Sequence, residues 1–178
     1  MGVIEQRKFT LCPTEADYEF SLLFVECEFC SRLFASCCIH KSYGGDLYRT
    51  ELEGGRCCHF SKLVFTDGAC SNNGLDGAKG GLGITIGVSE EYCWSTPVTD
   101  AVDPSAAART NQRAELLAAI EGLKKLEDRF REDHHTSTGY IPKQKRREYI
   151  VVSDSEYVVK GITEWFPTWR VGPYCRTC

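Results

Sequence analysis

Short apolar runs alternate with polar segments through the last two-thirds of the chain, and these runs predict four strands. Residues 63–65 and 149–152 are continuous apolar runs of the kind found in buried strands. A glycine-rich run over 80–88 predicts another strand, and residues 91–95, with two aromatic side chains, predict a fourth. Because the link at 88–90 is short, these last two strands should form an antiparallel hairpin.

The period changes to that of a helix from Thr110 onward. Apolar residues recur three and four positions apart, which predicts a helix that buries one face: Leu116, Ala119, Ile120, Leu123, Leu126 and Phe130. Thr110 or Asn111 is the expected N-cap. The polar stretch from 130 to 147, which ends in a basic run, predicts a loop. Residues 157–165 predict a second helix that Pro167 should end.

The order of these elements is three strands, a helix, a strand and a helix, which predicts an α/β fold with a mixed sheet flanked by helices. The composition changes near residue 61, because the preceding segment is rich in cysteine and has few long periodic stretches. We therefore expect a small Cys/His-rich module over residues 1–61 and a second domain over residues 62–178.

Composition and charge narrow the class of protein. The 178 residues are 42% hydrophobic and 26% charged, which is typical of a globular protein. A net charge of −4 argues against nucleic-acid binding by a basic coat over the whole chain. There is no apolar run long enough for a membrane span and no secretory h-region near the start. We expect an intracellular monomer that does not bind membranes.

Three acidic residues stand where the predicted elements would bring them together. Asp67 follows the first strand, Asp154 follows the last strand, and Glu115 lies early in the first helix. If the two strands are parallel neighbours, the three carboxylates converge, and they repel one another unless a cation joins them. Oxygen ligands with open positions suit Mg²⁺ or Mn²⁺, and such sites carry out displacement at phosphate. Taken singly, each acid is more often a turn residue, an exposed helix residue or an N-cap.

The residues around these acids form three ordered motifs. They are Thr66-Asp67-Gly68-Ala69-Cys70-Ser71-Asn72-Asn73-Gly74, Thr110-Asn111-Gln112-Arg113-Ala114-Glu115-Leu116 and Ser153-Asp154-Ser155-Glu156-Tyr157-Val158. In order and spacing they resemble the type 1 ribonuclease H family, in particular its fungal branch. The resemblance covers about residues 62–170 and implies a ribonuclease H-like fold.

The resemblance implies metal-dependent endonucleolytic hydrolysis of the RNA strand in RNA/DNA hybrids, with two divalent ions. Asp67 would bridge both ions, and Glu115 and Asp154 would complete the site. Polar residues at family positions would contact the hybrid in its minor groove, where amide side chains can read 2′-hydroxyl groups. The implied substrate-binding set is Gly68, Cys70, Asn73, Asn111, Gln112 and Trp165. Packing is an equal alternative for Trp165, and Glu156 stands where bacterial relatives often have Gln.

The chain departs from the family after Trp169. The family continues with a basic substrate handle, a fifth strand and a final helix, which supply a fourth acidic ligand. No residue after Asp154 matches that ligand. We expect an incomplete C-terminal part, for which three explanations compete: a fragment, a shortened domain that binds nucleic acid without cutting it, or a partner that supplies the acid.

The cysteines of the first segment form a separate candidate site. Seven of the eleven cysteines lie in the first 58 residues. Two of them, Cys27 and Cys30, have the CxxC spacing. In an intracellular protein such clusters favour zinc over disulfides. We expect a structural zinc ion on Cys27, Cys30, Cys38 and Cys58, with Cys37, His40, Cys57 and His59 as substitutes. The alternative is a set of buried free thiols.

Overall fold

The computed structural model describes residues 8–10, 16–27, 30–36, 61–105, 107–136 and 148–166. In chain order the elements are η2 (Phe20–Leu22), β1 (Phe24–Glu26), β2 (Leu33–Ala35), β3 (Ser61–Ser71), β4 (Lys79–Thr85), η3 (Glu90–Tyr92), β5 (Cys93–Pro97), α2 (Asn111–Thr136), β6 (Glu148–Val152), α3 (Glu156–Lys160) and η4 (Gly161–Trp165). Here η2 and η3 are 3₁₀ turns and η4 is a π-helical turn that continues α3. Within this described part, none of the helices is both long and apolar enough to cross a membrane.

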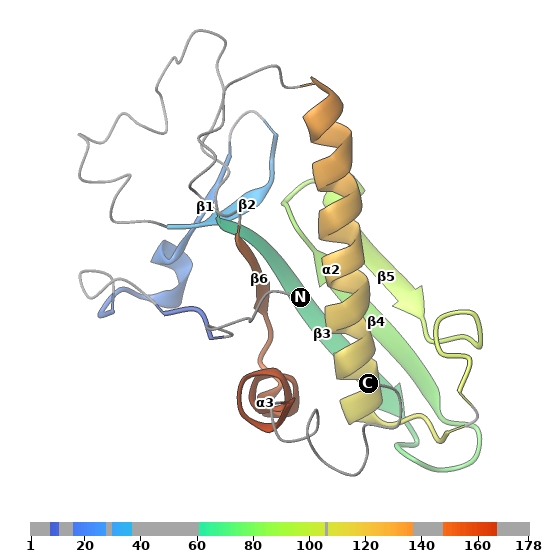
Figure 1. Ribbon diagram of the computed structural model, residues 1–178. Coiled ribbons are helices and arrows are strands. Elements are labelled where there is room, and N and C mark those ends of the chain that lie inside the picture. Colours follow the sequence, from blue (N-terminus) through green and yellow to red (C-terminus); the bar gives the residue numbers. More distant parts are fainter. Residues whose placement is uncertain are drawn as a thin grey trace, which may run out of the picture.

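The six strands form one mixed sheet around β3 (Figure 1). β3 pairs with β4 antiparallel and β4 pairs with β5 antiparallel, which confirms the predicted hairpin. β6 pairs with β3 in parallel, with Phe65 opposite Val152. The sheet therefore has the mixed topology that the ribonuclease H-like prediction requires.

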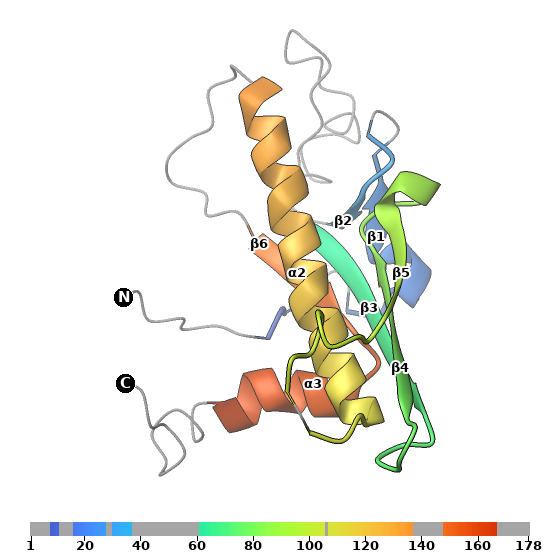
Figure 2. The same cartoon turned by 90° about the vertical axis from the view of Figure 1, so that its right-hand side faces the viewer.

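Helix α2 lies along one face of the sheet, and α3 lies at one end of it (Figure 2). Alternate residues of β3 point toward α2, so Val64 is fully buried with Ile84 and Leu126 in the core between helix and sheet. A second cluster, nearer the start of α2, joins Leu82 and Ala118. Cores of this kind fix the height of the helix above the strand that carries Asp67.

The opposite face of the sheet is covered in part by the N-terminal segment. Leu63 is buried there, and Phe65 and Phe24 pack edge-to-face with ring centroids 5.4 Å apart. β1 and β2 extend the same sheet, because Phe34 pairs with Lys62. The sequence predicted no strand before residue 61, and two strands of three residues each are too short to produce a clear periodic signal. The division at residues 61 and 62 stays a prediction.

Several predicted boundaries were wrong. β3 does not end at residue 65 but continues through Asp67 to Ser71, because polar residues in its second half still pair with β4. The hairpin strands are shifted, since η3 occupies the start of the strand predicted over residues 91–95. Helix α2 runs to Thr136, well into the stretch from 130 to 147 that was predicted as a loop. The basic run at 143–147 lies outside the described residues.

The buried stripe of α2 also differs from the prediction. Ile120 and Leu123 are 48% and 38% exposed, whereas Ala114 and Ala118 are buried and Gly122 lies against the sheet. A Cβ atom at Gly122 would lie 2.7 Å from Cγ2 of Thr66, so the helix approaches the strand more closely than a larger residue would allow. Small side chains, which a hydrophobic pattern undervalues, thus select the face that packs.

Candidate active site

Asp67 and Asp154 lie side by side because β3 and β6 are parallel neighbours. The last register pair joins Phe65 to Val152, and each aspartate stands two residues further along its strand direction. Asp67 is inside β3, whereas Asp154 follows the end of β6. The N-cap of α3 is Ser155, whose Oγ accepts a hydrogen bond from the Val158 N–H at 3.4 Å. The capping explanation for Asp154 is therefore wrong, and its carboxylate is available for another role.

Glu115 reaches the same place from α2. Thr110 caps the helix, since its Oγ1 accepts a hydrogen bond from the Arg113 N–H at 3.2 Å. The backbone N–H of Gly68 donates to Oε2 of Glu115 at 3.1 Å. A Cβ atom at Gly68 would lie 2.3 Å from the carbonyl carbon of Ala114. Only glycine therefore lets the first turns of α2 lie directly on β3.

The three carboxylates form one cluster. Asp67, Glu115 and Asp154 each offer an oxygen atom, and these atoms lie within 4.8 Å of one another. Burial raises the pKa of Glu115 above its usual value, and the neighbouring charges of Asp67 and Asp154 raise it further. Three negative charges so close together repel one another, and a bound cation removes this repulsion. Oxygen ligands that leave some coordination positions open suit Mg²⁺ or Mn²⁺. The residues present thus fit the predicted divalent-metal site.

Polar groups next to the cluster connect the start of α2 to the β3–β4 turn. Oδ1 of Asn111 accepts a hydrogen bond from the Cys70 N–H at 2.7 Å. Oδ1 of Asn73 accepts one from the Asn111 N–H at 2.8 Å. Because both amide oxygens are used in this way, the amide NH₂ groups are the atoms that can donate to a ligand. Three predicted substrate-binding residues are thereby brought together.

The other members of the predicted set lie nearby or pack. Gln112 is exposed at the start of α2, beside Asn111. Trp165 is half-buried and packs edge-to-face on Tyr157, with ring centroids 5.4 Å apart. Glu156 is exposed and forms an ion pair with Lys160, one turn further along α3. These contacts show a packing role for Trp165 and leave its contact with a substrate a prediction.

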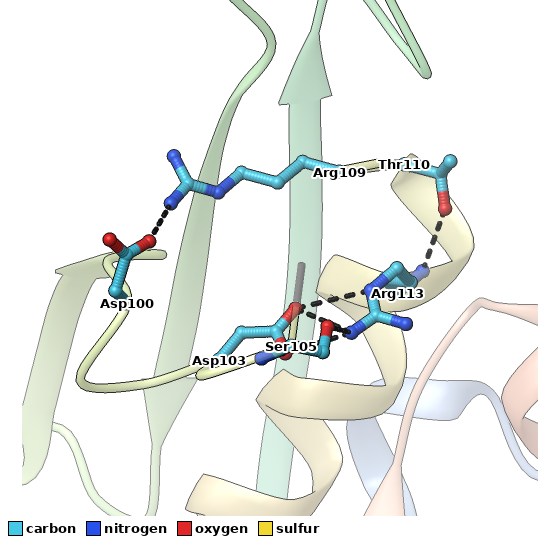
Figure 3. Close-up of polar contacts among 6 residues, drawn as sticks. All are labelled: Asp100, Asp103, Ser105, Arg109, Thr110 and Arg113. Atoms are coloured by element: carbon cyan, nitrogen blue, oxygen red, sulfur yellow. Dashed lines mark hydrogen bonds and ion pairs between the residues drawn. The ribbon is translucent and has the colours of Figure 1, made fainter. Parts of the chain in front are cut away.

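A loop between β5 and α2 carries an ion pair that sequence reasoning missed (Figure 3). The Arg113 guanidinium donates to both carboxylate oxygens of Asp103, at 2.8 and 2.6 Å, and also contacts Ser105. These hydrogen bonds hold the pKa of Asp103 below its usual value. The Asp103 side chain is 7% exposed, whereas Asp100, paired with Arg109 in the same loop, is 95% exposed. Arg113 belongs to the sequence motif at residues 110–116, but no sequence pattern marks Asp103 as its partner.

The candidate zinc ligands are only in part within the described residues. Cys27 and Cys30 lie in the turn between β1 and β2, where the Ser31 N–H donates to the carbonyl oxygen of Cys27 at 2.7 Å. Cys27 is buried, and burial raises the pKa of the Cys30 thiol. The neighbouring Cys27 side chain also raises the pKa of Cys30. Cys38 and Cys58 lie outside the described residues, as do their substitutes.

A family model and individual known proteins both match this chain, and their names agree. The sequence model of a family described as RNase H matches residues 60–177. A ribonuclease H of Pseudomonas entomophila is 35% identical over 107 residues, which are 60% of this chain and 54% of that protein. The ribonuclease HI of Pseudomonas syringae pv. tomato is 36% identical over 107 residues, 60% of this chain and 53% of that protein. The chain thus spans about half the length of the curated relatives it matches.

A solved structure, that of the foamy viral protease-reverse transcriptase in complex with dsDNA, is also similar. The matched region covers 62% of this chain and 58% of the chain in that structure, with a TM-score of 0.39 and 25% sequence identity.

Proposed function

This chain belongs to the RNase H family, and we propose that it hydrolyses the RNA strand of RNA/DNA hybrids with divalent metal ions. One observation carries the proposal: carboxylates from β3, from α2 and from the residues after β6 converge within 4.8 Å. The three acids come from three separate elements, and each acid lies in one of the three sequence motifs. Relatives at 35–36% identity are named ribonuclease H or ribonuclease HI.

The three acids would hold the metal, and other residues would position the substrate. When bound there, Mg²⁺ or Mn²⁺ supplies Lewis-acid activation of water and stabilises the charge that develops on phosphate. The Gly68 N–H fixes the Glu115 carboxylate, so this ligand is oriented before metal binds. The side-chain oxygens of Asn73 and Asn111 accept backbone hydrogen bonds, which leaves their NH₂ groups as donors for a substrate. We infer that these donors contact base edges and 2′-hydroxyl groups in the wide minor groove of the hybrid.

The experiment is cleavage of an end-labelled RNA/DNA hybrid in Mg²⁺ or Mn²⁺. Single-stranded RNA and duplex DNA of the same sequence serve as competing substrates, and Asp67→Asn serves as the inactive control. We expect cutting of the RNA strand in the hybrid alone, abolished by the substitution. Binding of the hybrid without cutting in either metal would contradict hydrolysis, and cutting of duplex DNA would contradict the substrate class.

We also propose that Cys27 and Cys30 contribute two thiolates to a structural zinc ion, with Cys38 and Cys58 as the other ligands. The supporting observation is that both described thiols share one tight turn and interact. Burial raises the pKa of the Cys30 thiol, so zinc would have to displace its proton, and zinc binding should weaken as pH falls. Elemental analysis of the purified protein should find one zinc per chain, and Cys27→Ser should remove it. A metal-free wild-type protein with an unchanged fold would contradict this proposal.

A further inference from the structure

Asn73 is the only asparagine of this chain that precedes a glycine. The sequence has three asparagines, and the other two precede an asparagine and a glutamine. An asparagine amide is lost when the backbone nitrogen of the next residue attacks the side-chain carbon Cγ. Glycine has no Cβ atom to obstruct this attack, so an Asn-Gly pair is the most reactive kind. Asn73 and Gly74 are both exposed in the turn between β3 and β4, so water reaches them.

The bond changes at this pair are those of an intramolecular substitution followed by hydrolysis. The nitrogen of Gly74 forms a bond to Cγ of Asn73, and the bond from Cγ to Nδ2 breaks. The amide nitrogen leaves as ammonia and takes the proton of the Gly74 N–H with it. The cyclic imide then adds water at one of its two carbonyl carbons. One opening gives aspartate, and the other gives isoaspartate, in which the backbone runs through Cγ.

Two hydrogen bonds restrain both reacting groups in the folded protein. The Gly74 N–H donates to the carbonyl oxygen of Arg109 at 2.8 Å, so the attacking nitrogen is held through its proton. Oδ1 of Asn73 accepts from the Asn111 N–H at 2.8 Å, which fixes the side-chain carbonyl group on the start of α2. Attack requires the nitrogen to lose its proton and Cγ to turn toward it, so both bonds must break first. The reaction therefore depends on local opening of the contact between this turn and α2.

We propose that Asn73 is a deamidation site, that the folded start of α2 protects it, and that its reaction removes an amide used for binding the hybrid. The effect on binding rests on the proposed function, in which the NH₂ group of Asn73 donates to the substrate. Aspartate keeps an oxygen that can accept from the Asn111 N–H, but it has no donor and adds a negative charge near phosphate. Isoaspartate also lengthens the backbone of the turn. Each product weakens binding, so the protein loses affinity for the hybrid as it ages.

The first test measures the modification without reference to activity. The purified protein is incubated in mildly alkaline buffer with and without urea, and peptide mass spectrometry follows deamidation at each asparagine. We expect product at Asn73, none at its exposed neighbour Asn72, and a rate at least about tenfold higher in urea, where both hydrogen bonds are lost. Equal rates with and without urea overturn protection by the fold. Absence of product at Asn73 in urea overturns the site itself.

The second test removes one of the two protecting bonds. Asn111→Pro lacks the N–H that donates to Asn73, and proline is well tolerated at the first position of a helix. Asn111→Ala is the matched control, because it loses the same side chain and keeps the N–H. We expect deamidation of the folded protein to be about three- to tenfold faster in Asn111→Pro than in Asn111→Ala, the loss of one hydrogen bond. Thermal unfolding shows that both variants are folded during the incubation, and equal rates in two folded variants overturn protection by this bond.

The third test measures the effect on binding. Asn73→Asp imitates one product, and Asn72→Asp places the same charge on the adjacent residue of the turn as a control. Binding of a fluorescent RNA/DNA hybrid is measured by anisotropy without divalent metal, so that cutting does not enter. We expect Asn73→Asp to raise Kd about three- to tenfold, and more than Asn72→Asp does.

The outcomes separate this inference from the proposed function. Equal binding by wild type and Asn73→Asp overturns the effect of deamidation on binding, even if the wild-type protein cuts the hybrid. A wild-type protein that binds the hybrid and cuts nothing contradicts hydrolysis alone, and weaker binding by Asn73→Asp then still supports this inference. A wild-type protein that binds no hybrid overturns both the proposed function and the effect on binding.

Discussion

The backbone N–H of Gly68 donates a hydrogen bond to Oε2 of Glu115 across 47 positions of sequence. This bond joins the residue after one candidate metal ligand to a second candidate ligand. It exists because α2 lies directly on β3 where Gly68 has no side chain. One glycine thus controls both the packing of the helix and the position of a carboxylate.

Gly68→Ala should destabilise the fold. The added methyl group would lie 2.3 Å from backbone atoms of Ala114 and Glu115, so α2 must move away from the strand. We expect the free energy of unfolding to fall by at least about 2 kcal/mol in urea denaturation, as for an overpacked core. Gly81→Ala, where the new Cβ meets nothing within 4 Å, should leave it within about 0.5 kcal/mol. Equal stability of the two variants would show that the helix does not rest on Gly68.

Asp67→Asn should stabilise the metal-free protein and remove its response to metal. The Asp67 charge contributes to the raised pKa of Glu115, so its loss relieves repulsion in the cluster. For the wild-type protein, Mg²⁺ at a tenfold excess over Kd should raise Tm by about 3–6 °C in a thermal scan.

The control for this scan is Asp128→Asn, an exposed aspartate on α2 outside the cluster, which should respond to Mg²⁺ as the wild type does. If Mg²⁺ raises the Tm of Asp67→Asn as much as that of the wild type, the ion binds elsewhere.

The Asp103–Arg113 pair should make stability depend on pH. The pKa of Asp103 is lowered in the folded protein by hydrogen bonds from Arg113, so the pair stabilises the fold above the ordinary pKa of an aspartate. This contribution is lost as pH falls through the lowered pKa. Urea unfolding at pH 7 should show a less stable Asp103→Asn variant, and the difference from wild type should shrink at acid pH.

Asp100→Asn is the comparison for that measurement, because Asp100 forms its ion pair with Arg109 while 95% exposed (Figure 3). Exposed pairs contribute little, so this variant should match the wild type at both pH values. If the difference in unfolding free energy between Asp103→Asn and the wild type grew toward acid pH, this prediction would be contradicted.

Asn111→Asp should separate folding from substrate binding. The carboxylate keeps an oxygen that can accept from the Cys70 N–H, but it loses the amide donor and adds a charge near phosphate. We expect unchanged thermal unfolding and a Kd for the hybrid raised about three- to tenfold, which is the loss of one hydrogen bond. Asn72→Asp adds the same charge in the adjacent turn and should have a smaller effect. Similar losses in both variants would assign the effect to charge alone.

The sequence predicted the carboxylate cluster better than the elements that build it. Asp67, Glu115 and Asp154 were expected together because the motifs and a parallel strand pair placed them at one end of the sheet, and they lie within 4.8 Å. The strand end at Asp67 was wrong, since a polar residue inside a paired strand has the same local pattern as one that follows it. The cluster was still predicted correctly because it depends on the register of β3 and β6.

Residues that depend on close approach or on loop conformation could not be predicted. Ile120 was expected in the core, but the helix packs through Ala118 and Gly122, which carry almost no hydrophobic signal. Asp103 pairs with Arg113 through a loop whose path no periodicity describes. Phe20 reaches the edge of the site from a segment for which no element was predicted, so its place beside Asp67 follows only from the tertiary structure.

The parallel pairing of β3 with β6 determines when the carboxylate cluster can form during synthesis of the chain. Ser61 pairs with Glu148, so the pair closes only after the segment that contains β4, β5 and α2 has been made. Pairing of segments so distant in sequence is slow, because loop-closure entropy must be lost before the contact contributes. A nascent chain that ends before Glu148 has two of the three acids and lacks β6, the strand that leads to Asp154. Assembly of the candidate metal site is therefore a late event in folding, and it reports on completion of the sheet.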